Sequence, residues 1–221
     1  MTKYVGIDGC PAGWIAVFIN EHSVLNVKVQ KNLKDFSFDR QNPNDIILID
    51  MPLGLENRPD GELRKTMKKN KSSVFTIDFT KKLSKQTEAI KPKIYEANKF
   101  IGGFNPIFHF WESHPEFCFE LLNNRKGLFP KKTGAGQAER LLILKKYLGL
   151  AEIEKLLQEA SKQGKDAFFK FDDLLDAACL AVMAKIIGTK ENCSVITDKG
   201  KQMTVPDRYP FIAYAKNFGH Y

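Results

Sequence analysis

Five acidic residues of this 221-residue chain follow or begin strongly apolar segments, where their side chains could bind metal ions. Asp8 follows "YVGI", Asp50 follows "IILI" and Glu112 follows "FHFW". Asp173 and Asp176 open "DDLLDAACLAVMA" three residues apart, a spacing that places both on one face of a helix. Converging carboxylates repel one another unless cations lie between them, and two shared Mg²⁺ or Mn²⁺ ions resolve that repulsion. We predict all five as catalytic residues and the four aspartates as metal ligands.

These acids could instead have purely structural roles. Asp8-Gly9 is typical of a tight turn, and Asp50 could simply end a strand before Met51-Pro52. Asp172 and Asp173 could cap a helix and complement its dipole.

The residues that follow Glu112 could likewise have structural roles at the start of a helix. Pro115 favours the first position of a helix, with Ser113 or His114 near its cap. Glu116 would then complement the helix N-terminus rather than take part in chemistry.

The elements that must position these acids follow from hydrophobic patterning. Val, Ile and aromatic residues separated by turn residues predict a three-strand meander at residues 5–8, 14–20 and 24–29. A short helix is expected within residues 31–45, and "IILI" at 46–49 is typical of a strand buried on both faces. A further strand is predicted at 107–113, and later helices at about 87–101, from Pro115 onward, and at 137–148 and 172–187.

Residues 55–106 are rich in lysine. We interpret them as a basic, mainly helical insertion within a single domain that spans residues 1–221. The run "LRKTMKKNKSS" could be a solvated helix face, or a phosphate-binding arm with Phe75, Phe79 and Tyr95 as stacking aromatics. The segment "KKTGAG" could bind phosphate or be a plain loop before a helix. The predicted substrate contacts are Lys68, Lys69, Lys71, Ser72, Ser73, Lys131, Lys132 and Thr133.

Composition narrows the class of protein. A formal net charge of +8 suits an anionic partner such as nucleic acid. Four scattered cysteines form neither a zinc pattern nor a disulfide framework, and we interpret them as reduced thiols. Neither a signal peptide nor a membrane-spanning run is recognisable, so we expect a cytoplasmic protein that does not associate with membranes.

Six motifs in order resemble one known family. "GIDGCPAGW", "IDMPLGL", "SSVF", "ESHPEFCF", "KKTGAG" and "DDLLDA" are similar to those of the predicted RNase H-like nucleases, also called domain of unknown function 429. "DLLDAACLA" also resembles the final-helix D-x-x-D-A pattern of Holliday-junction resolvases. The resemblance implies an α/β, ribonuclease H-like mixed sheet. In it a three-strand meander is followed by parallel strands and flanked by helices, with the helical insertion between the fourth and fifth strands.

These observations favour a metal-dependent phosphoesterase, foremost a nuclease that cleaves phosphodiester bonds by a two-metal mechanism with Mg²⁺ or Mn²⁺. Nucleic acid is the expected partner, and a homodimer stays open. The alternative is a non-catalytic nucleic-acid-binding or regulatory protein on the same fold. An actin-like or sugar-kinase-like phosphotransferase is less favoured, because "DGCPAGW" has the glycines of a phosphate loop and lacks its hydroxyl.

Overall fold

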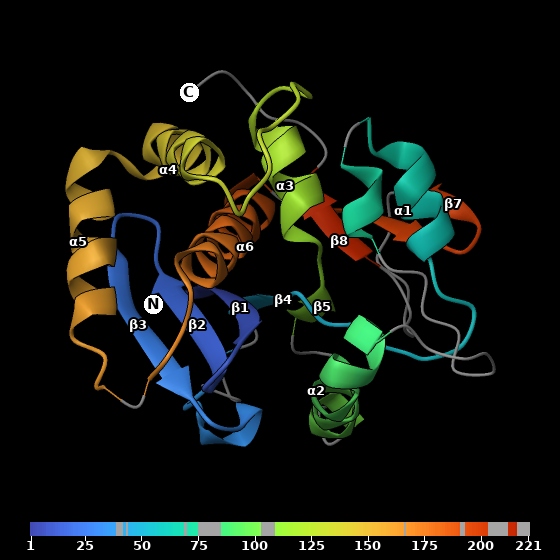
Figure 1. The fold of residues 1–221 in the computed structure, drawn as a ribbon, viewed down its shortest axis with the longest axis horizontal. Helices are drawn as coiled ribbons and strands as arrows, with labels where there is room; N and C mark the ends of the chain where they lie inside the picture. The colour runs from blue at the N-terminus through green and yellow to red at the C-terminus, as the bar shows by residue number, and fades with distance from the viewer. Residues whose placement is uncertain are drawn as a thin grey trace.

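One mixed sheet organises the chain, with helices packed on both of its faces (Figure 1). The computed structural model describes residues 1–38, 42, 44–68, 70–74, 85–102, 109–165, 167–190, 193–202 and 212–215. Within these residues the sheet has eight strands in the order β3-β2-β1-β4-β5-β8-β6-β7. No helix in this described part of the chain is both long and apolar enough to cross a membrane.

The first three strands form the predicted antiparallel meander. They are β1 (Tyr4–Cys10), β2 (Gly13–Ile19) and β3 (Val24–Gln30). The β1–β2 turn needs glycine at position 13, where φ is +136° and a Cβ would lie 2.4 Å from the Gln30 carbonyl oxygen. The meander thus supplies one edge of the sheet and places β1 in its interior.

Parallel strands then extend the sheet from β1. β4 (Ile46–Ile49) pairs parallel with β1, and β5 (His109–Glu112) pairs parallel with β4. This arrangement confirms the predicted ribonuclease H-like order of a meander followed by parallel strands. Because β1 and β4 run in the same direction, the residues that follow them meet at one edge of the sheet.

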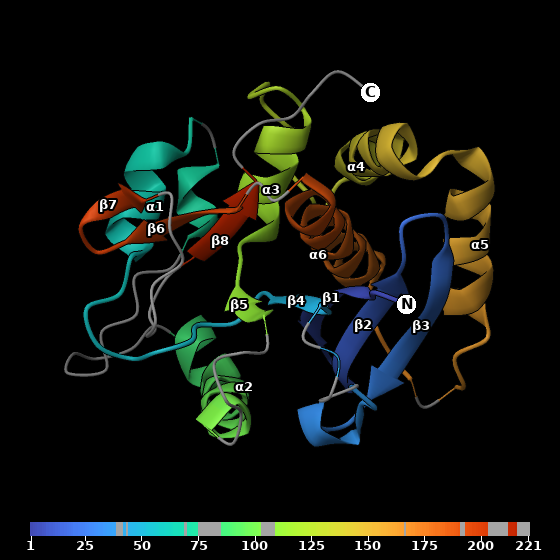
Figure 2. The same ribbon diagram turned by 180° about the vertical axis from the view of Figure 1, so that it is seen from behind.

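Three later strands lie beyond those that the sequence patterns predict. β8 (Ile212–Ala215) pairs parallel with β5, and the hairpin β6 (Cys193–Thr197) and β7 (Gly200–Gln202) continues the sheet antiparallel to β8. Figure 2 shows these strands on the far side of β5 from the meander. They widen the sheet to eight strands.

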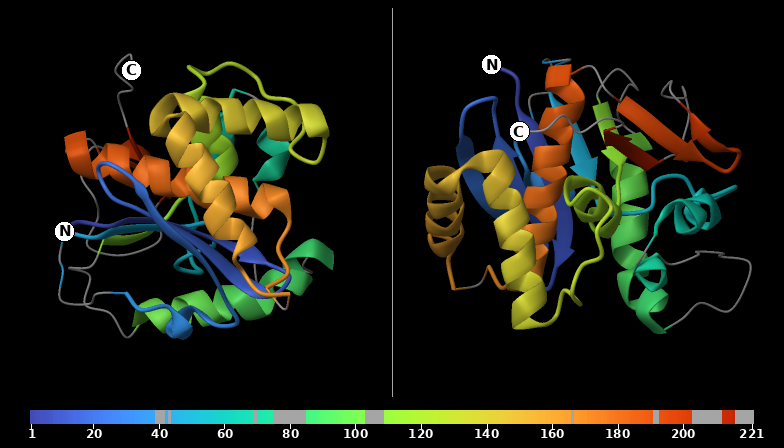
Figure 3. Two further views of the ribbon diagram at one scale, coloured as in Figure 1. Left: turned by 90° about the vertical axis from the view of Figure 1, so that its left-hand side faces the viewer. Right: turned by 90° about the horizontal axis from the view of Figure 1, so that it is seen from above.

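Helices on one face cover the meander and the central strands. Helix α6 (Phe171–Lys190) crosses β1, β2 and β4, and α3 (Pro115–Leu122) and α4 (Gly134–Leu148) pack against it. Helix α5 (Leu150–Ser161) packs against β3 and α4. On the other face lie α2 (Lys85–Gly102) and the single 3₁₀ turn at Leu33–Asp35, as the left view of Figure 3 shows. The short helix expected within 31–45 is therefore one 3₁₀ turn. The core is divided by the sheet into two layers.

The segment from 55 to 106 holds three elements in its described residues. Helix α1 (Asp60–Thr66) and a 3₁₀ turn at Lys71–Ser73 precede α2, which begins two residues before its predicted start. Leu63 and Met67 of the first part join the core layer of α6, whereas Ile94 and Ala97 of α2 join the opposite layer. The segment thus contributes to both faces of the sheet.

A close contact between β1 and α6 fixes the helix on the sheet. At Gly6, an added Cβ would lie 2.0 Å from the carbonyl oxygen of Ala177 and 2.3 Å from the amide nitrogen of Ala181. Both neighbours are backbone atoms, so neither can move without shifting the helix. Glycine at position 6 therefore allows α6 to lie directly on β1.

We expect Gly6→Ala to destabilise the protein, because the methyl group must push α6 away from the sheet. Overpacking of this kind typically costs about 1–3 kcal/mol or more in the free energy of unfolding. Chemical denaturation followed by circular dichroism measures the effect. The control is Gly61→Ala in α1, where nothing lies within 4 Å of the added Cβ. If the two variants are equally stable, the close contact does not constrain the fold.

Candidate active site

Three aspartates from distant parts of the chain line one cavity of about 320 Å³. Asp8 lies near the carboxyl end of β1, and Asp50 directly follows β4. Asp176 lies in the second turn of α6, next to the residue that contacts Gly6. The parallel pairing of β1 with β4 and the close packing of α6 therefore bring these three side chains together.

Burial and mutual repulsion oppose the ionisation of these carboxyl groups and raise their pKa values. Burial raises the pKa of Asp8 well above its usual value, and the neighbouring Asp50 and Asp176 raise it further. Burial also raises the pKa of Asp50. The pKa of Asp176 rises to about 7, chiefly by burial, although Lys131 acts in the opposite direction. The cavity thus concentrates negative charge in a poorly solvated place.

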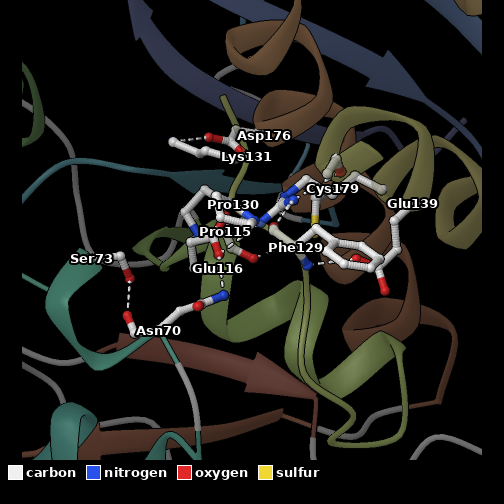
Figure 4. A network of polar contacts seen from close by, with 12 residues as sticks. Asn70, Ser73, Pro115, Glu116, Phe129, Pro130, Lys131, Glu139, Asp176 and Cys179 are labelled. Carbon is white, nitrogen blue, oxygen red and sulfur yellow. Dashed lines mark hydrogen bonds and ion pairs between the residues drawn. The ribbon is translucent and has the colours of Figure 1, made fainter. Parts of the chain in front are cut away.

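Lys131 supplies a positive charge to this cluster. Its Nζ donates a hydrogen bond of 2.6 Å to Asp176 Oδ2, and the side chain of Asp176 is fully buried (Figure 4). Burial alone would lower the pKa of Lys131, but Asp176 outweighs it and raises that pKa. The other oxygen, Asp176 Oδ1, is buried and has no hydrogen-bond partner among the described residues.

The donor chemistry of this cluster fits a hard divalent cation. Carboxylate oxygens are the ligands that Mg²⁺ and Mn²⁺ prefer, and Asp176 Oδ1 is a buried oxygen available to such an ion. As placed in the described residues, however, no group of three or more His, Cys, Asp or Glu side chains could hold a metal ion. Asp8, Asp50 and Asp176 supply oxygens of the chemical type that such an ion prefers, and all three line the cavity.

Asp173 lines the same cavity but also has a structural partner. Its Oδ2 accepts a 2.8 Å hydrogen bond from the backbone N–H of Lys170, as the third residue of a helix does when it reaches back to the residue before the helix. Burial raises its pKa. Of the two acids on α6, Asp176 is the one that faces Lys131 and acts electrostatically on both Asp8 and Asp50.

Glu112 also borders the cavity, with both oxygens already bonded. Oε1 and Oε2 pair with the guanidinium of Arg58, and Oε2 also accepts a 2.7 Å hydrogen bond from the backbone N–H of Leu53. Burial is the largest influence on Glu112 and raises its pKa to about 7. The structure thus places Glu112 in a buried ion pair whose cation, Arg58, no sequence pattern singles out.

The neighbouring acid Glu116 belongs to a second buried ion pair. Both of its oxygens accept hydrogen bonds from Arg140 Nη2, at 2.7 and 2.9 Å, and Arg140 is completely buried. Asn70 Nδ2 donates a further bond to Glu116, as Figure 4 shows. His114 caps α3, its Nδ1 accepting a hydrogen bond from Phe117 N–H. The contacts confirm His114 at the cap of α3, and both His114 and Glu116 also line the cavity.

The predicted substrate contacts fall into three groups. Lys68, Lys71, Ser72 and Lys132 are exposed, and Ser73 lines the cavity while its hydroxyl donates to the Asn70 carbonyl. Thr133 caps α4, where its Oγ1 accepts a hydrogen bond from Gly136 N–H. Lys69 and the possible stacking aromatics Phe75 and Phe79 lie outside the described residues.

All four cysteines are free. Cys10, beside the cavity, has its pKa raised chiefly by burial, with Asp173 and Asp8 acting in the same direction. A thiol with a raised pKa is a poor nucleophile, and we assign it no role.

The raised pKa values predict a pH dependence of stability. A carboxyl group whose pKa is higher in the folded than in the unfolded protein binds more protons when folded, so ionising it opposes folding. For Asp176 this penalty develops between pH 3.8, the ordinary pKa, and about 7. In chelator, the free energy of unfolding should therefore decrease as the pH rises through this window.

Asp8→Asn tests whether the buried carboxyl groups cause this pH dependence. The substitution removes one repelling charge and leaves the Asp176–Lys131 pair in place. We expect the variant to be more stable than the wild type at pH 7.5, because the buried charge of Asp8 and its repulsion of Asp50 and Asp176 are removed. Its stability should also vary less with pH. Denaturant unfolding at several pH values measures both effects, and a variant less stable than the wild type at pH 7.5 would contradict the prediction.

Comparison with known proteins agrees with the resemblance seen in the motifs. A family model described as "Protein of unknown function (DUF429)" matches residues 6–201. Neither the curated proteins nor the solved structures contain a significant match to this chain. The family match includes β1, β4, β5 and α6, and thus every acid of the cavity. The chain therefore belongs to the DUF429 family of proteins of unknown function.

Proposed function

We propose that this protein is a metal-dependent phosphoesterase, and specifically a nuclease that hydrolyses phosphodiester bonds. The observation that carries the proposal is the convergence of Asp8, Asp50 and Asp176 on one cavity, with a buried oxygen of Asp176 that has no partner among the described residues. Strongly perturbed carboxyl groups in a cavity are a recognised sign of a functional site. Carboxylates clustered at the carboxyl end of parallel strands suit the binding of Mg²⁺ or Mn²⁺.

The proposed chemistry assigns a separate task to each part of the cavity. When bound, the divalent ion lowers the pKa of a water molecule and stabilises the leaving oxygen. Asp8, Asp50 and Asp176 hold that ion, and Lys131 can donate a hydrogen bond to a phosphate oxygen. The Glu112–Arg58 pair borders the same cavity, where it keeps the wall rigid rather than binding the ion.

The direct test is a cleavage assay with single-stranded, duplex, hybrid and branched nucleic acids in Mg²⁺ or Mn²⁺. We expect cleavage by the wild type that chelator abolishes. Asp8→Asn and Asp50→Asn should each lower the rate by at least about 100-fold, because a metal held by too few charges cannot acidify its water.

Asp198→Asn is the matched control for this assay. Asp198 is an exposed residue between β6 and β7 that does not line the cavity, so the same substitution there should leave cleavage unchanged. Cleavage that persists in Asp8→Asn would exclude this cavity as its source. Metal-independent binding without any cleavage would instead favour the second candidate below.

The second candidate is a non-catalytic nucleic-acid-binding protein on the same fold. The ion pair between Lys131 and Asp176 favours it, because a lysine can partly neutralise the acids without any metal. In this case the cavity would be structural, and Asp8→Asn would leave nucleic-acid binding unaffected.

Both candidates share nucleic acid as the proposed partner. The net charge is +8, and Lys65, Lys68 and Lys71 are exposed on and after α1. Lys65 also contacts Glu62 at 2.6 Å, but its side chain remains 76% exposed and the pair can open toward solvent. These side chains could neutralise phosphates along a strand.

We expect the affinity for a nucleic-acid oligomer to fall steeply as salt is raised. Changing Lys65, Lys68 and Lys71 together to Gln should make the slope shallower by about one unit for each phosphate that is no longer neutralised. Fluorescence anisotropy at several salt concentrations measures the slope. Lys145, Lys146 and Lys155 on α4 and α5, changed to Gln, are the control for total charge. An equal change of slope in both variants would show that no specific arm exists.

A further inference from the structure

We propose that Lys131 acts as the second cation of the aspartate cavity, so that the site binds one divalent ion where the sequence alone suggests two. This inference rests on the proposed function and refines it. The contact that carries it is the 2.6 Å hydrogen bond from Lys131 Nζ to Asp176 Oδ2, while Asp176 Oδ1 has no partner within the described part of the chain. One oxygen of Asp176 thus already binds the ammonium group of Lys131, and the other is available to a divalent ion from solution.

The loop that carries Lys131 is held in place by several bonds. Thr133 donates two hydrogen bonds to the Pro130 carbonyl, from its backbone N–H at 3.0 Å and from its hydroxyl at 2.8 Å. Gly136 approaches the same carbonyl so closely that an added Cβ would lie 2.1 Å from its oxygen. The backbone on either side of Lys131 is therefore fixed by the start of α4.

Arg140 secures the same loop from inside the protein. Its Nη1 donates to the carbonyls of Phe129 and Gly136, at 3.0 and 2.9 Å, and its Nη2 binds Glu116 of α3. Figure 4 shows Phe129, Pro130 and Lys131 beside Glu116. The buried Arg140 joins α3 to both ends of this loop and so holds the backbone that carries Lys131, whose side chain is 35% exposed.

The balance of charge points to the same number of ions. Asp8, Asp50 and Asp176 together carry three negative charges when ionised, which one divalent ion and one ammonium group neutralise. Beside Lys131, a second divalent ion would give these three acids excess positive charge; Asp173, the fourth aspartate that lines the cavity, accepts a hydrogen bond from the Lys170 N–H instead. Lys131 is also drawn electrostatically to Asp8 and Asp50 as well as to Asp176, so its ammonium interacts with all three acids.

The experiment counts bound Mn²⁺ by the room-temperature paramagnetic resonance signal of the free ion. It compares the wild type with Lys131→Met, which keeps a similar length and removes the charge. Lys131→Arg keeps the charge, and Lys132→Met is the matched control at the exposed neighbouring lysine. Low-temperature spectra show whether two bound ions are close enough to couple magnetically.

We expect one Mn²⁺ per chain in the wild type, in Lys131→Arg and in Lys132→Met, and two coupled ions in Lys131→Met. Two ions in the wild type would overturn the inference and leave the proposed function standing, as would a single ion in a folded Lys131→Met. If Lys131→Met does not fold, the wild-type count alone decides between one ion and two. Absence of Mn²⁺ binding in every variant would overturn the proposed function together with the inference.

Discussion

The constraint on which this structure depends is the burial of negative charge at the carboxyl end of the central strands. Moving a carboxylate out of water is unfavourable by several kcal/mol unless a cation or hydrogen-bond donors compensate. Three buried acids are paired with basic side chains, Asp176 with Lys131, Glu112 with Arg58, and Glu116 with Arg140, and Arg58 also pairs with the buried Asp60. These pairs connect α3, α4, α6 and the loop before α1 around a single cavity.

The three pairs differ in how many oxygens of the acid bind the basic side chain. Glu112 accepts from two nitrogens of Arg58, a bidentate geometry that suits a permanent structural contact. Both oxygens of Glu116 accept from the single nitrogen Arg140 Nη2. Asp176 binds its lysine through one oxygen only. A lysine is a point charge that can also donate to a bound anion, whereas a guanidinium held on both sides has no such freedom. Arginines thus pair with the glutamates of the cavity wall, whereas a lysine pairs with the aspartate of the proposed ion site.

The sequence patterns predict the centre of this arrangement well because its determinants are local. The buried run before Asp50, the meander that begins with β1 and the apolar length of α6 each show in a few consecutive residues. They predict the order of the first five strands and which acids stand at strand ends. Helix α5 is absent from the predicted elements although its buried residues Ile153, Leu156 and Ala160 have helical spacing. The hairpin of β6 and β7 is absent as well, although Asp198-Lys199-Gly200 between two short runs is a turn signal.

The parts that sequence patterns do not predict depend on pairings between distant residues. Arg58 is one basic residue in an ordinary loop, and its partner Glu112 lies on a strand far along the chain. Arg140 occupies a helix position that a sequence pattern would assign to solvent until α3 is placed beside it. No periodicity or spacing marks either arginine, because the pairing exists only after the sheet and helices have assembled. Glu112 at the end of β5 matches the pattern of a ligand, yet that pattern gives no sign of its partner.

Gly6 and the part of α6 that it contacts lie far apart in the sequence, so this contact forms late in the synthesis of the chain. Strand β1 leaves the ribosome long before α6, which follows it by about 160 residues of chain. Pairings between distant segments form slowly because a long loop must close first. A nascent chain therefore carries Asp8 and Asp50 before it carries Asp176 or the loop of Lys131. The complete cavity exists only after α6 has been synthesised, so the proposed nuclease activity would be absent while most of the chain is still being translated from its messenger RNA.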